Sequence, residues 1–427
     1  MSTMISDLPV AVIGESDGRW RTTTLCLAVD FGSRDDPPGR GGVAHLLEHL
    51  LMSAPVDGGH SLSERVERLG GQANATTGLD RMFFQAQVLG DHVPEVARLL
   101  TRAVLDPRLD HAVVETERQA VLQELAAAAA DPSDTVQDAY LAACFPGHPL
   151  GRPVGGSDEA VRALELTDVL GVHREVFLGR RMALVCTGGT APGKVAEHLA
   201  GTAVTRVPAS APSAPPAPPA PPAPSAPSAP SAATEPVADL AALPWAPQGA
   251  GADPDGFSWL ATGSRAPSTG DPRRHAFTVL AHLLGPSPAS LLYRRLRGQE
   301  GLVYAFYTWS RSYTETGAWR IMAGVENRNL RRAQEVVREV LLEVAGRGPD
   351  PEDLAVARRQ AVTDLVTTAE RPWDHAMTLS QETGLGTRSW SLEDGIRALE
   401  RVTVEEVRLA AVAVTERQLT VVRPEPA

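Results

Sequence analysis

Cysteine is scarce in this chain of 427 residues, and lysine and long apolar segments are nearly absent. The three cysteines, Cys26, Cys144 and Cys186, are odd in number and far apart, and no CxxC pair occurs. This pattern excludes a disulfide framework and predicts a protein of the reducing cytoplasm. Lys194 is the only lysine among 40 basic residues. We attribute the abundance of arginine to the codon bias of a GC-rich genome, not to function.

Composition also excludes two classes of partner. The longest apolar runs are far shorter than the roughly 20 residues of a membrane helix. The N-terminal segment has neither the basic nor the apolar region of a secretory signal. The net charge of −12 and the pI of about 5.4 provide no basic surface for a phosphate backbone. We therefore expect neither a membrane nor a nucleic acid as a partner.

A proline-rich segment divides the chain. Residues 208–230 contain 11 prolines in 23 positions. Proline fixes φ and lacks an N–H donor, so this segment predicts an extended spacer of roughly 70 Å at ~3.1 Å per residue. An inert spacer is the simplest interpretation, and a docking site for a proline-recognition domain is the alternative. The predicted division is an N-terminal domain, 1–207, a linker, 208–246, and a C-terminal domain, 247–427.

The two halves resemble each other in sequence. In each, an alternating strand that ends in Gly-Ser-Arg precedes a loop and a helical stretch, which reads AHLLEHLL in the first half and AHLLGPSP in the second. Where the first half has Glu48 and His49, the second has Gly285 and Pro286, which end a helix. The first half therefore keeps polar side chains that the second has lost.

The pattern within each half mixes strands with helices. Strand patterns at 72–78 and 82–89 follow each other like the arms of a hairpin, and helical patterns such as 43–53 and 111–130 lie on either side. Such mixing predicts largely antiparallel sheets packed with helices. We therefore expect an α+β protein made of two related α/β-sandwich halves.

The motif HLLEH contains His45, Glu48 and His49. In a helix, positions i and i+4 share a face, so both imidazoles can bind one tetrahedral metal ion while Glu48 projects to the same side. This is the inverted form of the HExxH zinc motif. A random HxxEH is expected only about 0.02 times in a chain of this composition. The neighbouring residues are apolar, and burying unpaired polar groups is costly, so the motif predicts a metal centre.

The third ligand should be an acid on another element. The helical run 113–130 contains Glu117 and Glu124, which are seven residues apart and share a face, whereas Glu115 points elsewhere. Either acid can be the ligand, with the other orienting a histidine, and both can also be ordinary solvated carboxylates. The spacing does not choose among these.

With these residues, the sequence resembles the insulinase/pitrilysin family of zinc metallopeptidases, the inverzincins. It is most similar to the short bacterial members related to mitochondrial processing peptidase. The blocks FGSRDDPPGRGGVAHLLEHLLM, LGGQANATTG, FPGHPLGRPVGG and LRGQEGLVYAFYTW all read like those of the family. The resemblance implies Zn²⁺ held by His45, His49 and Glu124, with Glu48 as the catalytic base. It also implies that Glu117 is the outer acid, which orients a ligand histidine.

The resemblance implies two further pairs of functional residues. Asn74 and Ala75 match the edge strand on which a peptide substrate lies as an added β-strand, although the bare sequence predicts turn residues there. Arg297 and Tyr304 match the pair that the second half contributes to bind the scissile carbonyl and its developing oxyanion. Without the resemblance, they read as a surface arginine and a strand aromatic.

Three features depart from the family pattern. The stretch LLMSAP after the metal helix lacks the usual aromatic–Gly–Thr sequence, GPSPAS replaces a glycine-rich loop, and the proline-rich linker is unusual. None of them contains a predicted ligand. The glycine-poor loop and the linker bear on how the second half approaches a substrate.

The resulting prediction is a zinc-dependent endopeptidase. Its halves are expected to form a clamshell around a chamber that favours short or unfolded peptides. A homodimer, or a heterodimer with a related subunit, is the expected assembly. The alternatives are a subunit whose active site needs a partner chain, a non-catalytic partner subunit, or a structural metal module. The last would be expected to close all four coordination positions with Cys and His.

Overall fold

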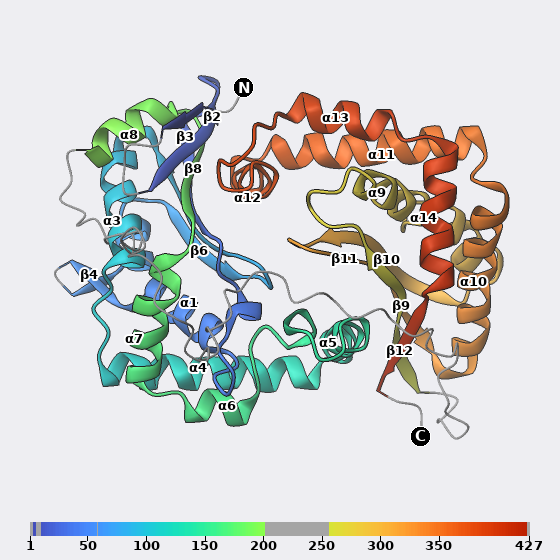
Figure 1. Ribbon diagram of the computed structural model, residues 1–427, viewed down its shortest axis with the longest axis horizontal. Coiled ribbons are helices and arrows are strands. Elements are labelled where there is room, and N and C mark those ends of the chain that lie inside the picture. Colours follow the sequence, from blue (N-terminus) through green and yellow to red (C-terminus); the bar gives the residue numbers. More distant parts are fainter. Residues whose placement is uncertain (1–2, 6–9, 58, 201–255, 425–427) are drawn as a thin grey trace, which may run out of the picture.

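A computed structural model describes residues 3–5, 10–57, 59–200 and 256–424. The proline-rich linker predicted at 208–246 lies outside these residues. The described residues form two halves, each built on one sheet with helices packed against it (Figure 1). The predicted α+β class and the two largely antiparallel halves are therefore confirmed.

The N-terminal half contains a six-stranded sheet in the order β1-β2-β8-β3-β7-β6. Strands β2 and β8 pair in parallel, and the other neighbours pair antiparallel. Strand β6 is an edge strand. The bounds are Thr3–Ile5 (β1), Ala11–Ser16 (β2), Thr22–Val29 (β3), Gln72–Thr77 (β6), Met82–Leu89 (β7) and Met182–Gly188 (β8), with a separate ribbon of Pro55–Asp57 (β4) and His60–Ser61 (β5).

The C-terminal half contains a four-stranded antiparallel sheet in the order β10-β11-β9-β12. Strand β10 lies at one edge, and a register shift between Val303 and Phe306 interrupts its pairing with β11. The strand bounds are Phe257–Ala266 (β9), Val303–Ser312 (β10), Gly317–Glu326 (β11) and Leu419–Arg423 (β12).

Most helices cover one face of the sheet in their own half. In the N-terminal half, apolar residues of this face, such as Leu25, Leu27 and Phe84, form one core with the helices. In the C-terminal half, Trp319 and Ile321 do the same. The helices are Val43–Ser53 (α1), Leu62–Arg68 (α2), Val93–Leu105 (α3), His111–Ala130 (α4), Asp158–Ala163 (α6), Leu166–Glu175 (α7), Pro192–Ala200 (α8), Arg274–Leu283 (α9), Leu330–Arg347 (α10), Pro351–Ala369 (α11), Leu392–Glu400 (α13) and Val404–Glu416 (α14).

Two helices cross to the opposite half. Helix α5 (Pro132–Cys144) packs on the second face of the C-terminal sheet, where Tyr140 is fully buried and donates a hydrogen bond to the Trp319 carbonyl at 2.8 Å. Helix α12 (Pro372–Glu382) packs on the second face of the N-terminal sheet through Ala376 and Leu379. Figure 1 shows each helix lying against the sheet of the other half. The halves therefore complete each other's cores.

Local sequence signals account for several element ends. Helix α9 ends at Leu283, two residues before Gly285 of the predicted stop at Gly285 and Pro286. Residues Tyr293–Gln299 form a π-helix. Strands β2 and β12 have only six and five residues, and the pairing of β2 with β8 and of β12 with β9 joins segments distant in sequence, which no local pattern indicates. No helix among the described residues has the length and apolar character needed to cross a bilayer.

Candidate metal centre

Helix α1 carries the HLLEH motif on one side and packs into the core with the other. Val43, Leu46, Leu47 and Leu50 are fully buried, because the apolar positions of the motif recur at helical spacing. The remaining positions, 45, 48 and 49, are only partly buried and turn away from the core. The packing therefore fixes the helix so that its polar face is presented as a unit.

Asp36 secures the start of this helix. Its Oδ2 accepts a hydrogen bond from the Gly42 amide at 2.6 Å, and its Oδ1 accepts one from the Ala44 amide at 3.0 Å. Burial raises the pKa of Asp36 to about 7, while these two amides favour the charged carboxylate and act against that rise. Gly42 has φ of +87°, a conformation that suits glycine. This loop fixes the position of His45, the next residue after Ala44.

The acids expected from the sequence lie on helix α4, opposite α1. The buried Val121 lies between Glu117 and Glu124, which are two turns apart on the face toward α1. Glu115 instead forms an ion pair with Arg118 on the same helix. The structure therefore brings both candidate acids to the histidines and leaves Glu115 away from them.

The side chains of His45, His49 and Glu124 converge in an arrangement that could hold a metal ion. Glu124 Oε2 lies 3.3 Å from His49 Nε2 and 3.7 Å from His45 Nε2, and the ligand atoms of the three residues all lie within 4.8 Å of one another. Ligands at 2.0–2.1 Å from a tetrahedral zinc ion lie about 3.3 Å apart, so two nitrogens and one oxygen at these distances fit such an ion. Three protein ligands leave the fourth position free, which is typical of catalytic zinc.

The surroundings of both histidines favour the binding of a metal ion. Burial lowers the pKa of His45, which keeps the imidazole neutral with a lone pair for a metal. His49 Nδ1 lies 3.3 Å from Glu117 Oε2, while its Nε2 points to Glu124. An acid at Nδ1 fixes the tautomer in which Nε2 is the ligand atom. Glu117 therefore contacts the Nδ1 side of the His49 ring, and the Glu124 carboxylate lies on the Nε2 side.

Glu48 is held by a strand of the sheet. Thr77, the last residue of β6, donates a hydrogen bond from Oγ1 to Glu48 Oε2. Asn74 and Ala75 lie in the same edge strand, opposite Gln85 and Phe84 of β7. The strand predicted at 72–78 is therefore present as an edge strand, and the interpretation of these two residues as turn residues is wrong. The hydrogen-bonding groups along the free edge of β6 thus begin next to the metal helix.

Comparison with known proteins gives two matching family models. The model of insulinase (peptidase family M16) matches residues 11–158, and that of the peptidase M16 inactive domain matches residues 163–361. The chain belongs to peptidase family M16.

Relatives of this M16 chain include curated bacterial and fungal proteins. An uncharacterized zinc protease of Mycobacterium tuberculosis is 28% identical over 413 residues, which cover 96% of this chain and 87% of the relative. The β subunit of mitochondrial-processing peptidase from Lentinula edodes is 27% identical over 333 residues, covering 77% of this chain and 68% of that protein.

Solved structures show the same fold. A protease from Helicobacter pylori superposes with a TM-score of 0.79 at 17% identity, covering 99% of both chains. A putative M16-like peptidase from Alicyclobacillus acidocaldarius also gives a TM-score of 0.79, at 19% identity, covering 99% of this chain and 97% of the other. At these identities, the likeness concerns the fold alone.

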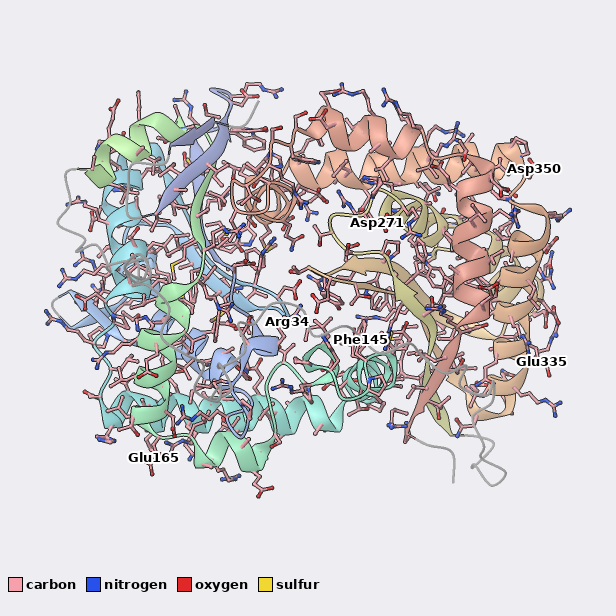
Figure 2. The ribbon with its side chains drawn as sticks, viewed as in Figure 1. Arg34, Phe145, Glu165, Asp271, Glu335 and Asp350 are labelled. Carbon is pink, nitrogen blue, oxygen red and sulfur yellow. The ribbon has the colours of Figure 1, made fainter. Side chains whose placement is uncertain are left out.

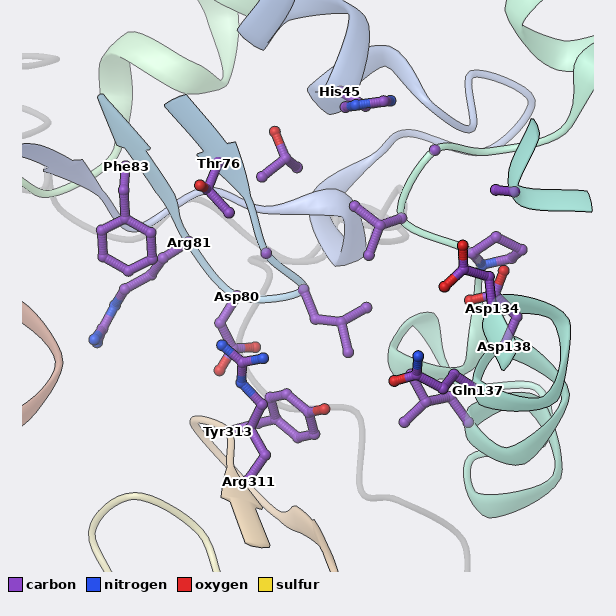
Figure 3. Close-up of a pocket in the computed structure, with 18 of the residues that line it drawn as sticks. His45, Thr76, Asp80, Arg81, Phe83, Asp134, Gln137, Asp138, Arg311 and Tyr313 are labelled. Carbon is purple, nitrogen blue, oxygen red and sulfur yellow. The ribbon is translucent and has the colours of Figure 1, made fainter. Parts of the chain in front are cut away.

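A pocket of about 1210 Å³ opens in front of the metal centre of this M16 chain. Its lining comes from both halves and includes His45, Glu48 and Glu124 together with residues 75–81 and 309–313. Figure 3 shows Thr76 and Asp80 on one side, His45 at the top, and Asp134 and Asp138 of α5 on the other side. Typical small-molecule pockets measure about 300–1,000 Å³, so this one has room for a larger ligand.

Arg297 and Tyr304 lie apart from this pocket lining. The Arg297 guanidinium lies 5.2 Å from the centre of the Tyr304 ring and 5.3 Å from that of Tyr293. Both predicted residues are exposed, and Tyr304 has 82% of its surface accessible. The structure therefore brings these two together as a pair on the C-terminal half, outside the pocket lining that includes His45, Glu48 and Glu124.

Sequence reasoning missed three groups around the site. Thr77 follows Ala75 on the same face of the strand predicted at 72–78, so the two-residue period of that strand would have pointed to it. Asp36 caps a helix from six residues before Gly42, beyond the reach of ordinary capping patterns. Asp138 reaches the pocket only because α5 crosses to the other half, which no local pattern reveals.

Proposed function

We propose that this M16 chain is a zinc-dependent endopeptidase that cleaves short or unfolded peptides. The observation that carries this proposal is the convergence of His45, His49 and Glu124 beside Glu48 at the wall of one pocket. The relatives named zinc proteases and mitochondrial-processing peptidase support the metal and the reaction type. The open fourth position distinguishes this site from a structural zinc module.

In the proposed mechanism, Glu48 moves the proton. A bound zinc ion would lower the pKa of water and polarise the scissile carbonyl. The Glu48 carboxylate accepts the proton of the attacking water and passes it to the leaving amine. The Thr77 hydroxyl bonds Oε2 and so orients the carboxylate, leaving Oε1 to take the proton. Glu117 holds His49 in the tautomer that suits a ligand.

Strand β6 would hold the substrate. A peptide that adds to the free edge of β6 forms main-chain hydrogen bonds along Asn74 and Ala75, so its alignment does not depend on its side chains. The hydrogen bond between Thr77 and Glu48 couples this strand to the catalytic base. A peptide on β6 would then have a backbone carbonyl near Glu48.

The α5 side of the pocket favours a basic side chain in the substrate. Asp134 and Asp138 are one helical turn apart, and both line the pocket. The pKa of Asp138 is raised first by partial desolvation and then by the negative charge of Asp134, while the Arg320 cation acts against that rise. A cationic side chain placed between them relieves that repulsion.

A library of unstructured peptides tests the proposed function. Purified zinc-loaded protein is expected to cleave internal bonds, and the products are expected to be enriched in an arginine or lysine near the cleaved bond. A chelator should abolish cleavage, and zinc should restore it. Intact peptides in the presence of stoichiometric zinc would refute the proposed function. Cleavage without a basic preference would refute only the role of Asp134 and Asp138.

We further propose that Arg297 and Tyr304 act on the metal centre of a second chain. Within one chain, the pair lies outside the pocket lining that holds the metal ligands, and its exposure makes it available to another copy. A homodimer would then contain two sites, each with zinc ligands from one chain and the Arg/Tyr pair from the other. A related partner subunit, or a non-catalytic one, is the alternative, since one relative is named as the β subunit of mitochondrial-processing peptidase.

Mixing two inactive variants distinguishes these assemblies. Glu48→Gln lacks the base, and Arg297→Ala lacks the cation of the pair. If the site combines two chains, a mixed dimer contains one intact site, so an equal mixture is expected to recover about a quarter of wild-type activity, by the statistics of random pairing of two-fold dimers. No recovery after exchange of subunits, shown by mass spectrometry, would contradict the two-chain site. Activity of the purified wild type alone would exclude a required partner.

The expected location is also a proposal. All three cysteines are buried free thiols, and burial raises the pKa of Cys144 and Cys186 to about 12. A chain without disulfides fits a reducing compartment, and we place it in the cytoplasm.

A further inference from the structure

The turns of two hairpins meet at the end of the pocket. One turn joins β6 to β7 in the N-terminal half, and the other joins β10 to β11 in the C-terminal half. Asp80 in the first turn accepts hydrogen bonds at Oδ2 from the Thr314 amide at 2.7 Å and from Thr314 Oγ1 at 3.1 Å. Two segments more than 200 residues apart in sequence are therefore tied directly together.

Arg34 strengthens this contact from the loop after β3. Its guanidinium binds both carboxylate oxygens of Glu315, with 2.6 Å from Nη1 to Oε2, and Nη1 also lies 2.8 Å from Asp80 Oδ1. His148 Nε2 lies 3.4 Å from the same Glu315 carboxylate. We call Arg34, Asp80, Thr314 and Glu315 the hairpin bridge.

The hairpin bridge is largely shielded from water. The side chains of Arg34, Asp80 and Glu315 expose only 14%, 16% and 11% of their surface. A two-pronged arginine–carboxylate contact in such a place is strong and geometrically specific, and salt screens it little. Figure 2 labels Arg34 and Phe145, which both lie where the two halves meet.

Backbone hydrogen bonds fix one turn, and ring packing fixes the other. The amides of Ser33 and Arg34 donate hydrogen bonds to the carbonyls of Gly78 and Leu79, at 3.0 and 3.1 Å. On the other turn, the buried Tyr313 packs edge-on against Phe145, with 6.2 Å between the ring centres. The bridge therefore joins two rigid turns and not two mobile side chains.

The bridge lies in line with the proposed substrate strand. Strand β6 ends at Thr77, and the turn begins with the next residue, Gly78. Residues of both turns, including Leu79, Asp80 and Tyr313, line the pocket. Figure 3 shows Asp80, Arg311 and Tyr313 at the end of the pocket opposite His45. A peptide paired with β6 advances about 3.3 Å per residue, so it meets the bridge within a few residues of Thr77.

We propose that the hairpin bridge is a stop that limits how far a bound peptide extends past Thr77, and so makes the enzyme selective for substrate length on one side of the cleaved bond. The other end of the peptide runs away from the bridge and is not limited by it. This inference rests on the proposed function, because it assumes a peptide on β6. The bridge residues act on substrate length and take no part in the chemistry.

A nested series of fluorescent peptides tests the stop. Each peptide keeps one scissile bond and is extended stepwise at its N-terminus or at its C-terminus. For the zinc-loaded wild type, we expect kcat/KM to fall about tenfold or more when one terminus passes a few residues, because a clash excludes the longer peptide, and to stay level for the other. Equal tolerance at both ends would overturn the stop.

Two variants open the bridge. Arg34→Met/Glu315→Met replaces both charged partners by apolar ones, and Glu315→Arg places a like charge against Arg34; the second serves if the first does not fold. We consider the peptide series extended at the terminus where the wild type shows its length limit. Each bridge variant is expected to cleave the long and short peptides of this series with kcat/KM values within about threefold of each other. Glu343→Gln, which breaks an exposed ion pair with Arg347 on α10, is the matched control and should keep the wild-type limit. A folded bridge variant that also keeps it would overturn the stop.

Binding of the same peptides, measured by fluorescence anisotropy, separates this inference from the proposed function. A one-sided length limit in binding without any cleavage would support the stop and refute the peptidase. Cleavage with no length limit would support the peptidase and refute the stop. Absence of binding by every peptide would refute both.

Discussion

Replacing Glu48 by glutamine is expected to leave a protein that binds zinc and cleaves almost no peptide. The amide keeps the shape of the side chain and can still accept the hydrogen bond from Thr77, but it cannot take up a proton at neutral pH. General base catalysis contributes about 10²- to 10⁴-fold, so kcat should fall by roughly a thousandfold. KM should change little, because Glu48 is not proposed to bind the peptide.

Thr77→Val is the companion substitution, which tests how far the position of Glu48 matters. It removes the hydroxyl that orients Glu48 while leaving the carboxylate in place, so kcat should fall by between about ten- and a hundredfold, the equivalent of one hydrogen bond to a charged group. Metal analysis and single-turnover cleavage measure both variants. Near-normal turnover of Glu48→Gln with zinc bound would show that another group is the base.

Replacing Glu124 by glutamine is expected to weaken zinc binding by more than about a hundredfold, beyond the effect of an outer partner. Its carboxylate oxygen lies with the two imidazole nitrogens, and the amide removes the negative charge that a divalent cation requires. Glu117→Gln should weaken binding by only about 10- to 100-fold, because Glu117 acts through His49. The two substitutions on one helix are thus expected to weaken zinc binding to different extents, with the larger loss for Glu124→Gln.

Glu115→Gln completes the series on the same helix. Glu115 pairs with Arg118 and lies away from the histidines, so its replacement should leave zinc affinity unchanged. Competition with a chromogenic chelator measures all three constants, and the rise of Tm on adding zinc gives a second readout. A larger loss for Glu117→Gln than for Glu124→Gln would reverse the assignment of ligand and supporting acid.

The sequence was sufficient for the parts of the site that lie on one helix. The spacing of His45, Glu48 and His49 sets their common face, because helical periodicity is local. The same periodicity left Glu117 and Glu124 equivalent, and their ranking needed either the family pattern or the packing of α4 against α1. Asparagine by itself favours turns, but the alternating pattern at 72–78 predicted a strand around Asn74, and the pairing with β7 confirms that strand.

The arrangement of the halves was less predictable. An amphipathic pattern such as that of α5 shows that a face is buried but not which sheet covers it. Tyr140 finds its partners on β9 and β11, more than 120 residues along the chain. Likewise, no local pattern shows that Arg297 and Tyr304 lie outside the pocket lining, because their position depends on the orientation of the C-terminal sheet.

The exchange of α5 and α12 makes each half an incomplete folding unit. Without α12, Phe83 and Val185 of one sheet would face water, and without α5, Met322 and Leu419 of the other would do so. Exposing such surfaces costs free energy in proportion to their area. Each half therefore supplies the helix that completes the core of the other.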